Sequence, residues 1–447
     1  MPSSMIDSLI FNDWFGSGEM RNIFSDEYRL QCWLDVEAAL ARGQAKIGMI
    51  PREAAEEISA KANVENLNFA KFKEEVDRTV HPLMPLIWEL QRVCQKEYGE
   101  YIHWGATTQD IMDTGMMLQI KAAASIIFRD LEVIEQLLKN LAQKHRSTLM
   151  AGRTHGQHAL PITFGFKVAV WLAEVRRHLQ RWEQSRSRIL VGNLSGAVGT
   201  HAAMGAKGLE VQRFLMAELG LGEPEITWHP ARDRIAEFVS LLSGICATLG
   251  KIAKEIINLQ KTEVGELAEP FVMGKVGSST MPQKRNPHLC EAVLALSKMV
   301  RTQAALAWEV MVQEHERDMA AWMVEWEMVP QVCILTSGVL KHSLTILRGL
   351  VVDERRMRAN LDLLKGLILA EPIMFALAEK IGHQAAHRLV YEIAMKTYEE
   401  GRTFREILLA DERVVKHISP EKIEQLLDPE KYIGLSSEIG DKVTEGI

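Results

Sequence analysis

A polar loop at residues 271–287 contains the side chains that are best suited to binding and reacting with an anion. The loop reads FVMGKVGSSTMPQKRNP, and its two glycines and two prolines exclude a regular helix. Its serines, Ser278 and Ser279, offer hydroxyl groups, and Lys284 and Asn286 offer further donors for a carboxylate. The loop therefore predicts an anion site, although an exposed polar connector has the same composition.

A second polar segment, at residues 103–110, precedes a long stretch without proline. It reads HWGATTQD and begins with His103. Unpaired N–H groups and the positive end of the dipole favour an anion at the start of a helix. Thr107, Thr108 and Gln109 are therefore candidate ligands of a substrate carboxylate, while a threonine in this place would also cap the helix.

The segment at residues 152–158 reads GRTHGQH and contains Thr154 and His155. A histidine can deliver a proton near neutral pH, so His155 is a candidate general acid. A histidine that simply lines a helix is the structural alternative. If the segment were helical, His155 and His158 could face one metal ion, but no carboxylate or cysteine completes a ligand set. We expect no metal and no other cofactor.

Long helices must position these three segments, because proline is absent from four long windows of the chain. Within the window from Pro230 to Pro270, apolar residues recur at alternating steps of three and four. These residues are Ile235, Phe238, Leu242, Ile245, Leu249, Ile252, Ile256 and Leu259. We predict a helix over residues 231–269, further long helices over 119–147 and 162–190, and a window between Pro287 and Pro330 that could hold another.

The predicted fold is all-α and has three parts. These are an N-terminal helical domain (residues 1–105), a central bundle of long helices that carries the loop (106–350), and a C-terminal helical domain (351–447). Apolar seams of this length often need more helices than one chain provides. We therefore expect a homo-oligomeric bundle, with a long intramolecular bundle as the alternative.

Composition excludes several classes of protein. The formal net charge is -7, which lacks the basic footprint of a nucleic-acid binder. No segment has the roughly 18 uninterrupted apolar residues of a membrane span. The five cysteines are scattered and odd in number, as expected for reduced thiols in a cytoplasmic protein.

The string GSSTMPQKRNP resembles the signature GSSxMPxKxNP of the aspartase/fumarase superfamily at every fixed position. The segments at 103–110 and 152–158 resemble the first and second motifs of that family, in the same order. The resemblance implies three helical domains, a homotetrameric core of central helices, and active sites built from several subunits. It also implies elimination from a substituted succinate to give fumarate.

The resemblance implies roles for the residues of the loop. Ser279 would be the base that removes a proton beside a carboxylate, and Lys284 and Asn286 would hold the enolate-like intermediate. A lone serine is a poor base, so its alkoxide would need nearby N–H groups or a cation.

Further roles come from the adenylosuccinate lyases of the family. They place an acid histidine in a THG motif and pair it with a glutamate shortly after the loop, and His155 and Glu291 match these positions. His81 loosely resembles a second substrate-contacting histidine. Arg317 is a candidate contact for the second carboxylate, and a surface ion pair with Glu314 or Asp318 is the alternative.

The choice among family members depends on two features. The chain resembles bacterial 3-carboxy-cis,cis-muconate cycloisomerases overall, yet those enzymes typically carry an aromatic residue in place of His155. Trp322, Met323 and Trp326 stand where adenylosuccinate lyases carry phosphate ligands, which disfavours a nucleotide. We predict a cofactor-independent lyase that cleaves a C–N or C–O bond of a substituted succinate, such as an N-substituted aspartate. The alternatives are a cycloisomerase, an adenylosuccinate lyase and a non-catalytic structural protein.

Overall fold

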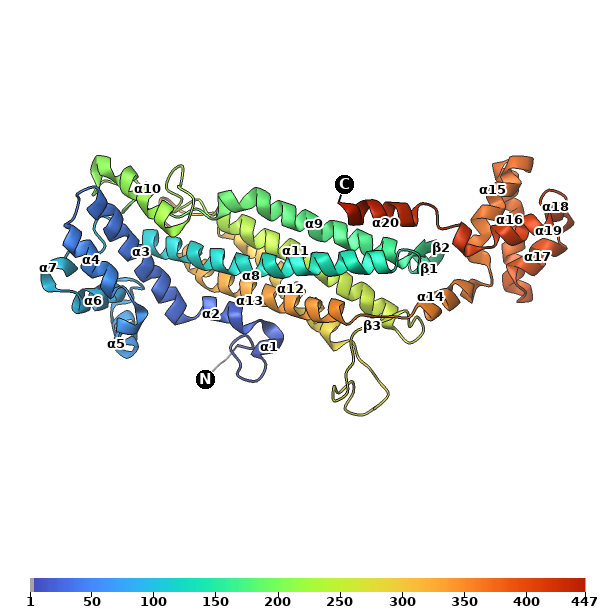
Figure 1. Cartoon of the computed structure of the whole chain (residues 1–447), viewed down its shortest axis with the longest axis horizontal. Coiled ribbons are helices and arrows are strands. Elements are labelled where there is room, and N and C mark those ends of the chain that lie inside the picture. Colours follow the sequence, from blue (N-terminus) through green and yellow to red (C-terminus); the bar gives the residue numbers. More distant parts are fainter. Residues whose placement is uncertain (1–3, 447) are drawn as a thin grey trace. The chain divides into compact units, whose positions relative to one another are not determined.

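The computed structural model describes residues 4–446, and α-helices dominate it (Figure 1). Its named strands form two short antiparallel pairs, β1 with β2 and β3 with β4. The prediction of an all-α fold is confirmed. Contacts divide the chain into two compact units, Met1–Leu131 with His178–Gly250 and Ala292–His342, and Glu132–Arg177 with Lys251–Glu291 and Ser343–Ile447. The division into three domains at residues 105 and 350 stays a prediction.

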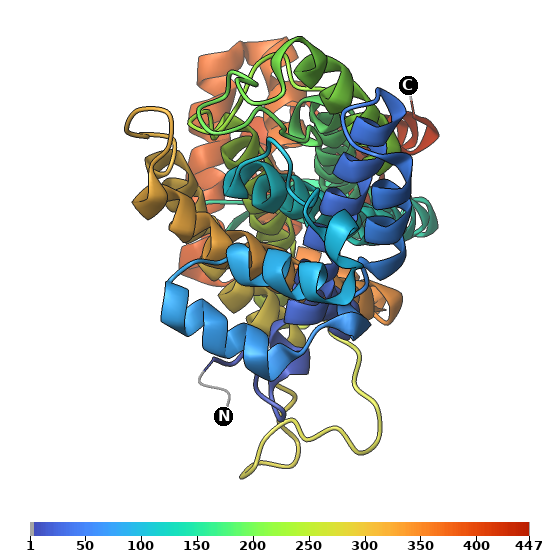
Figure 2. The same cartoon turned by 90° about the vertical axis from the view of Figure 1, so that its left-hand side faces the viewer.

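The first unit begins with short helices that pack around α3. Serine side chains cap α2 and α3, where Ser17 accepts from the Met20 N–H and Ser25 from the Tyr28 N–H. α3 packs against α4 and α10, and α6 packs against α4, α5 and α7 (Figures 1 and 2). These elements are α1 (Asn12–Phe15), α2 (Gly18–Ile23), α3 (Asp26–Lys46), α4 (Arg52–Lys61), α5 (Phe69–Thr79), α6 (Met84–Val93), α7 (Lys96–Gly99) and α10 (Gly208–Leu219).

Five longer helices supply residues to both units. They are α8 (Thr108–Lys144), α9 (Phe164–Ile189), α11 (Asp233–Gln260), α12 (His288–Glu309) and α13 (Met319–Arg348). All eight residues of the predicted apolar seam lie on α11, and all are buried. The seam therefore faces the core, as its period predicts.

Two predicted helix extents are wrong. The helix over 231–269 ends at Gln260, because the buried carboxylate of Glu266 accepts hydrogen bonds from Arg153 and Asn360 and the backbone then pairs as β3 (Leu267–Ala268) with β4 (Val351–Val352). The window between Pro287 and Pro330 holds two helices, separated by residues 310–318, and Pro330 lies inside α13. Tertiary contacts of Glu266 decided the end of α11.

Side chains join the long helices within the first unit. Phe128 of α8 stacks on Trp182 of α9, with ring centroids 4.4 Å apart. The Cys246 carbonyl on α11 accepts from the Ser297 hydroxyl on α12 at 2.6 Å. Such contacts pair α8 with α9 and α11 with α12 within the first unit.

α8 and α11 are long and apolar enough to cross a membrane by length and composition. However, 78% of the apolar window of α8 and 67% of that of α11 are buried inside the protein. Both helices therefore behave here as core helices of a folded protein.

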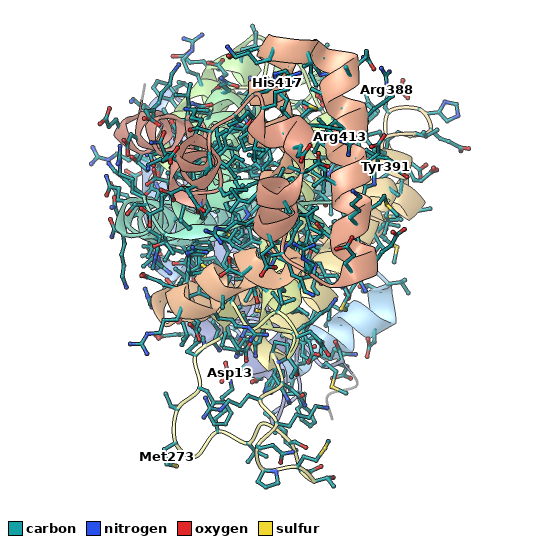
Figure 3. All side chains as sticks on the ribbon, turned by 90° about the vertical axis from the view of Figure 1, so that its right-hand side faces the viewer. Asp13, Met273, Arg388, Tyr391, Arg413 and His417 are labelled. Carbon is teal, nitrogen blue, oxygen red and sulfur yellow. The ribbon has the colours of Figure 1, made fainter. Side chains whose placement is uncertain are left out.

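The second unit contains a β-hairpin and the C-terminal helices. The hairpin pairs β1 (Leu149–Thr154) with β2 (Gln157–Thr163). Phe404, Leu377 and Ile393 are fully buried in the core of the C-terminal helices, while Arg413 and Tyr391 lie on their surface (Figure 3). These helices are α14 (Glu354–Leu361), α15 (Ala370–Ile381), α16 (His383–Glu400), α17 (Phe404–Ala410), α18 (Glu412–Val415), α19 (Pro420–Leu426) and α20 (Ser436–Glu445).

Candidate active site

The predicted signature loop is held at both ends and exposed between them. Glu269, before the loop, accepts hydrogen bonds from the N–H groups of Leu289 and Cys290 at the start of α12, and its carboxylate pairs with Lys275 at 2.9 Å. The middle of the loop extends into solvent, and the side chain of Met273 is fully exposed (Figure 3). The loop is thus a tethered segment with a free centre.

Local backbone contacts shape the turn that carries the two serines. The Ser278 hydroxyl accepts from the N–H groups of Thr280 and Met281 at 3.3 and 3.1 Å, so it supports the turn. Ser279 is exposed. A Cβ atom at Gly277 would lie 2.2 Å from the Lys284 carbonyl oxygen, so only glycine fits this close approach. The two halves of the loop therefore touch at Gly277, which presents Ser279 outward.

Lys284, Asn286 and Glu291 lie at the far end of this loop and in the first turn of α12. Lys284 and Glu291 are exposed, and Asn286 is partly buried. Among the described residues, none of these three side chains has a hydrogen bond or ion pair. All three are therefore free to bind a ligand or another chain.

His155 lies in a tight turn, not on a helix. The register pairs Thr154 with Gln157, and His155 and Gly156 have φ angles of +53° and +76°. Two positive φ angles are typical of a type I′ hairpin turn, which glycine adopts easily. The 152–158 segment is therefore not helical, so the condition under which His155 and His158 could face one metal ion is not met. Thr154 and His155 are both exposed at the tip of the hairpin.

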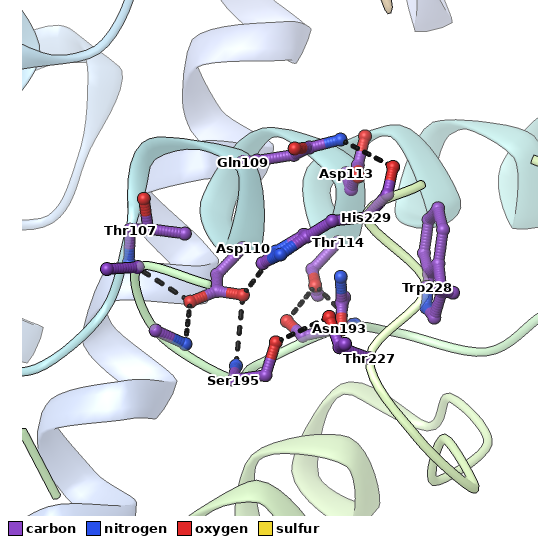
Figure 4. A network of polar contacts seen from close by, with 12 residues as sticks. Thr107, Gln109, Asp110, Asp113, Thr114, Asn193, Ser195, Thr227, Trp228 and His229 are labelled. Atoms are coloured by element: carbon purple, nitrogen blue, oxygen red, sulfur yellow. Dashed lines mark hydrogen bonds and ion pairs between the residues drawn. The ribbon is translucent and has the colours of Figure 1, made fainter. Parts of the chain in front are cut away.

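The start of α8 is organised around the buried carboxylate of Asp110 (Figure 4). It accepts hydrogen bonds from the N–H groups of Thr107 (3.0 Å), Ser195 (3.0 Å) and Gly196 (2.9 Å), and contacts the Nε2 atom of His229 at 2.9 Å. One carboxylate thereby joins the first turn of α8 to two distant loops. Charge-assisted bonds of this kind hold a helix start rigidly.

His81 and Thr108 meet beside this helix start. The Nδ1 atom of His81 accepts from the N–H groups of Leu83 and Met84, which assigns the proton of a neutral ring to Nε2. Nε2 lies 3.4 Å from the Thr108 hydroxyl oxygen. Burial, and then the charge of His103, lower the pKa of His81, so the ring is held in its neutral form.

Gln109 and Arg317 bind each other. The buried Gln109 amide accepts from Arg317 Nε at 2.8 Å and donates to the His229 carbonyl at 3.2 Å. Arg317 also donates to the Ala197 carbonyl at 3.1 Å. Gln109 therefore positions Arg317 within one chain. Across residues 4–446, Arg317 forms no ion pair with Glu314 or Asp318, so the surface-pair alternative is wrong.

A buried ionic cluster lies one turn further along α8. Arg232 binds Asp113 in a fork, at 2.7 and 3.0 Å, and donates from Nε to Glu325 at 2.9 Å. The Trp322 indole donates to Asp113 at 2.9 Å. Trp322 therefore points into the protein and supports the cluster.

A cavity of about 270 Å³ borders this cluster within the first unit. Its lining includes Trp33, Pro82, Met112, Met116 and Trp326. Pro82 follows His81 directly, and Met112 lies one helical turn from Thr108 on α8. The cavity therefore begins next to the predicted carboxylate ligands. Among residues 4–446, no group of three or more His, Cys, Asp or Glu side chains is arranged to hold a metal ion.

The predicted site residues belong to the two different units. His81, His103, Thr107, Thr108, Gln109 and Arg317 are in the first unit, and Thr154, His155, Ser278, Ser279, Lys284, Asn286 and Glu291 are in the second. Over the described part of one chain, no hydrogen bond or ion pair joins Ser279, His155 and Glu291 to one another. Their catalytic roles, including the pairing of His155 with Glu291, stay predictions.

Comparison with known proteins supplies the family. Residues 16–302 match the family model described as Lyase, and residues 366–443 match the one described as Adenylosuccinate lyase C-terminus. The chain belongs to the lyase family. This lyase is 46% identical over 443 residues to N-acetyl-S-(2-succino)cysteine lyase of Dickeya dadantii. The matched residues cover 99% of this chain and 97% of that protein.

Two further relatives represent the other members that the sequence resembles. This lyase is 43% identical to the adenylosuccinate lyase of Methanocaldococcus jannaschii, over 96% of this chain and 94% of that one. The crystal structure of 3-carboxy-cis,cis-muconate lactonizing enzyme from Pseudomonas putida superposes with a TM-score of 0.92 at 38% identity, covering 98% of each chain. The predictions of an enzyme, of this superfamily and of a lyase function are confirmed.

Several residues that organise the site were not predicted from the sequence of this lyase. They are Glu37, Asp110, Asp113, His229, Arg232 and Glu325. Asp110 closes the HWGATTQD segment, and His229 and Arg232 stand in the segment WHPAR at residues 228–232. Buried charges that pair across long sequence separations have no local signature. Only the polar residues beside Pro230 in WHPAR could have indicated His229 and Arg232.

We expect Asp110→Asn to lower the free energy of unfolding by about 1.5–3 kcal/mol, because a charged acceptor of several bonds is lost. An asparagine NH₂ group would also face backbone donors. Urea denaturation measures the change. Asp318→Asn is the matched control, since Asp318 only caps α13 through the N–H groups of Ala320 and Ala321, and asparagine caps equally well. Equal stability of the two variants would contradict the organising role of Asp110.

Proposed function

We propose that this lyase eliminates a thiol from an S-(2-succino) thiol, such as N-acetyl-S-(2-succino)cysteine, and releases fumarate. The observation that carries the proposal is the 46% identity to the Dickeya dadantii enzyme over 99% of this chain. The predicted substrate, a substituted succinate, is retained. The bond cleaved is C–S in place of the C–N or C–O bond favoured by the sequence.

Each predicted residue has a role in this reaction. Ser279 takes the proton from the carbon beside one carboxylate, and the electron pair forms the double bond of fumarate. The C–S bond breaks, and His155, oriented by Glu291, gives a proton to the departing thiolate. Lys284, Asn286 and Ser278 stabilise the charge that develops on the carboxylate. Ser279 accepts one proton and His155 donates one, so the elimination requires no cofactor.

The substrate has a second carboxylate, which is not beside the carbon that loses its proton. This second carboxylate needs its own ligands. Thr107 and Thr108 stand at the positive end of the α8 dipole, and Asp110 holds this turn in place before the substrate arrives. The remaining proposed substrate contacts are Arg317, His103, His81 and Thr154. Of these, Arg317 is held in place by Gln109. Donors that are already in place need no reorganisation during the reaction, which supports elimination chemistry.

A small leaving group suits the cavity beside α8. Its volume of about 270 Å³ and its lining of Trp33, Met112, Met116 and Trp326 suit a compact, partly apolar group. Trp322 is buried against Asp113, and Trp326 lines the cavity, whose lining also includes Arg29, Glu325 and Glu327. The two indole rings favour an acylated thiol over a nucleotide.

The homotetramer remains part of this proposal. Ser279 and His155 are exposed and unpaired in one chain, and the family resemblance implies active sites built from several subunits. A second and a third copy would then complete each site. A cytoplasmic location is proposed with it, and no membrane or nucleic-acid partner is required.

A substrate panel tests the proposal. Purified enzyme is incubated with N-acetyl-S-(2-succino)cysteine, adenylosuccinate and 3-carboxymuconate, while fumarate absorbance and free thiol are followed. We expect kcat/KM for the thioether to exceed the others by at least about tenfold, since a hydrogen-bonding site rejects groups that leave it unpaired. Faster turnover of adenylosuccinate or 3-carboxymuconate would overturn the C–S assignment. Absence of all turnover would support the non-catalytic alternative.

A further inference from the structure

A buried carboxylate on α3 holds His103 at the entrance to α8. Glu37 is 1% exposed, and its Oε1 atom lies 2.6 Å from His103 Nδ1. Its other oxygen accepts from the His103 backbone N–H at 3.1 Å. The side chain and the backbone of one residue are thus held by one carboxylate.

The backbone around His103 is clamped by the same face of α3. Gln44, two turns after Glu37, is fully buried and donates to the Trp104 carbonyl at 2.6 Å. His103 adopts a φ of +61°, a region that costs free energy for a residue with a side chain. Two buried polar groups on α3 therefore hold a strained turn directly before the proposed carboxylate site.

The second ring nitrogen of His103 is available to a ligand. The His103 side chain is 16% exposed to solvent, whereas the Glu37 side chain is fully buried. Over residues 4–446, no protein group bonds to His103 Nε2. An imidazole fixed through Nδ1 and open at Nε2 can donate one hydrogen bond to an anion.

Three ionisable groups face His103. Glu37 contacts it from α3, Asp110 lies in the first turn of α8, and His81 precedes α6. Burial opposes a charge on His103, but the Glu37 carboxylate, with help from Asp110, outweighs burial and raises the pKa of the ring. The pKa of the neighbouring His81 is lowered, so the pKa values of the two histidines are shifted in opposite directions.

We propose that Glu37 is a positioning residue that keeps His103 as an imidazolium, so that Nε2–H of His103 binds a substrate carboxylate as a fixed cation. Neutral His81 supplies an uncharged Nε2–H donor beside it. The inference deepens the proposed function, because it names the group that attracts the dicarboxylate. It depends on carboxylate binding at this site, and not on the identity of the leaving group.

The pH dependence follows from the direction of the shift. A histidine with a raised pKa keeps its charge further into the neutral range and loses it as pH rises through that pKa. Affinity for a dicarboxylate should therefore be high at the acidic end and fall as His103 deprotonates. Without the Glu37 charge, only Asp110 opposes the effect of burial on the ring, and the same fall should occur at lower pH.

Succinate binding, measured by calorimetry between about pH 6.5 and 9, tests the inference without any turnover, because succinate is then a dianion. Glu37→Gln keeps an acceptor for Nδ1 and removes the charge, and its NH₂ group replaces the oxygen that accepts from the His103 backbone N–H. We expect this variant to bind succinate about tenfold more weakly at neutral pH and to shift the fall in affinity to lower pH. In the turnover assay, KM should rise by a similar factor, with kcat changed less.

Glu89→Gln is the matched control, since Glu89 is equally buried on α6 but pairs with Lys71 and Arg92. Its succinate binding should keep the wild-type pH profile. His103→Gln should remove the pH-dependent fall altogether, and adding Glu37→Gln should then change nothing further.

A wild-type pH profile in Glu37→Gln overturns the inference, and so does a fall that persists in His103→Gln. The second variant decides the matter if the first does not fold. Failure of the thioether to react, together with the expected pH profile for succinate, would reject the proposed leaving group and leave this inference standing.

Discussion

Ser279→Ala is expected to lower kcat by roughly 10³-fold or more, because general-base catalysis contributes factors of about 10²–10⁴ and carbon deprotonation has no alternative base in this scheme. Serine can act as a base only where its alkoxide is stabilised, and loop closure over the substrate would supply N–H groups and Lys284. Steady-state kinetics with the proposed thioether measures the loss.

The fold should survive this substitution. Ser279 is exposed, and its hydroxyl bonds to no other described residue, so stability should change by less than about 0.5 kcal/mol. Thr280→Ala removes the neighbouring exposed hydroxyl and should retain kcat within a few-fold. If Ser279→Ala also stays within tenfold of the wild type, Ser279 is not the base.

Arg232→Ala is expected to lower the free energy of unfolding by about 3–5 kcal/mol, because it leaves two carboxylates buried without their cation. The Arg232 side chain is 1% exposed, and those of Asp113 and Glu325 are each 2% exposed. Trp322 adds one hydrogen bond to Asp113, which cannot replace a full charge. Urea denaturation of the folded protein measures the difference.

The loss should depend on pH. Burial raises the pKa of Glu325 even beside Arg232, and removal of the cation raises it further. A carboxyl group with a raised pKa binds more protons in the folded state than in the unfolded state, so its contribution to stability decreases as pH rises. The variant should therefore be more destabilised, relative to wild type, at pH 8 than at pH 5.5.

A surface pair provides the control for this variant. Arg52 and Glu56 form an ion pair at 2.7 Å, with side chains 84% and 61% exposed. Arg52→Ala should cost less than about 1 kcal/mol, as expected for a solvated pair. A similarly small cost for Arg232→Ala would show that the buried cluster does not hold α8, α13 and the residue before α11 together.

The all-α class, the long helices and the family could be predicted from the sequence for a physical reason. Helix periodicity is local, so the seam from Ile235 to Leu259 reports its buried face directly. The loop around Ser279 is also a local string, and its match to a family signature required no tertiary information. The lyase family and the confirmed enzyme function rest on these local patterns.

Other features depend on contacts between residues that are distant in the sequence. The end of α11 at Gln260 depends on Glu266 meeting Arg153 and Asn360. His155 was predicted only from its motif, with a helix-lining position as the alternative, and it lies in a hairpin turn because β1 and β2 pair on either side of it. This hairpin is close in sequence, with Thr154 opposite Gln157, but strand propensity depends on packing and leaves little trace in a six-residue segment.

The organisation of the carboxylate end of the site was decided by tertiary structure alone. His103, Thr107 and Thr108 were predicted from their motif, but Glu37 holds His103 across 66 residues of sequence, and Asp110, which binds the Thr107 N–H, is itself bound by Ser195 across 85 residues. A buried charge is tolerated only where folding brings its partners within hydrogen-bond distance. The sequence by itself therefore determined the family and the candidate reacting groups, and the fold determined which charges fix their positions.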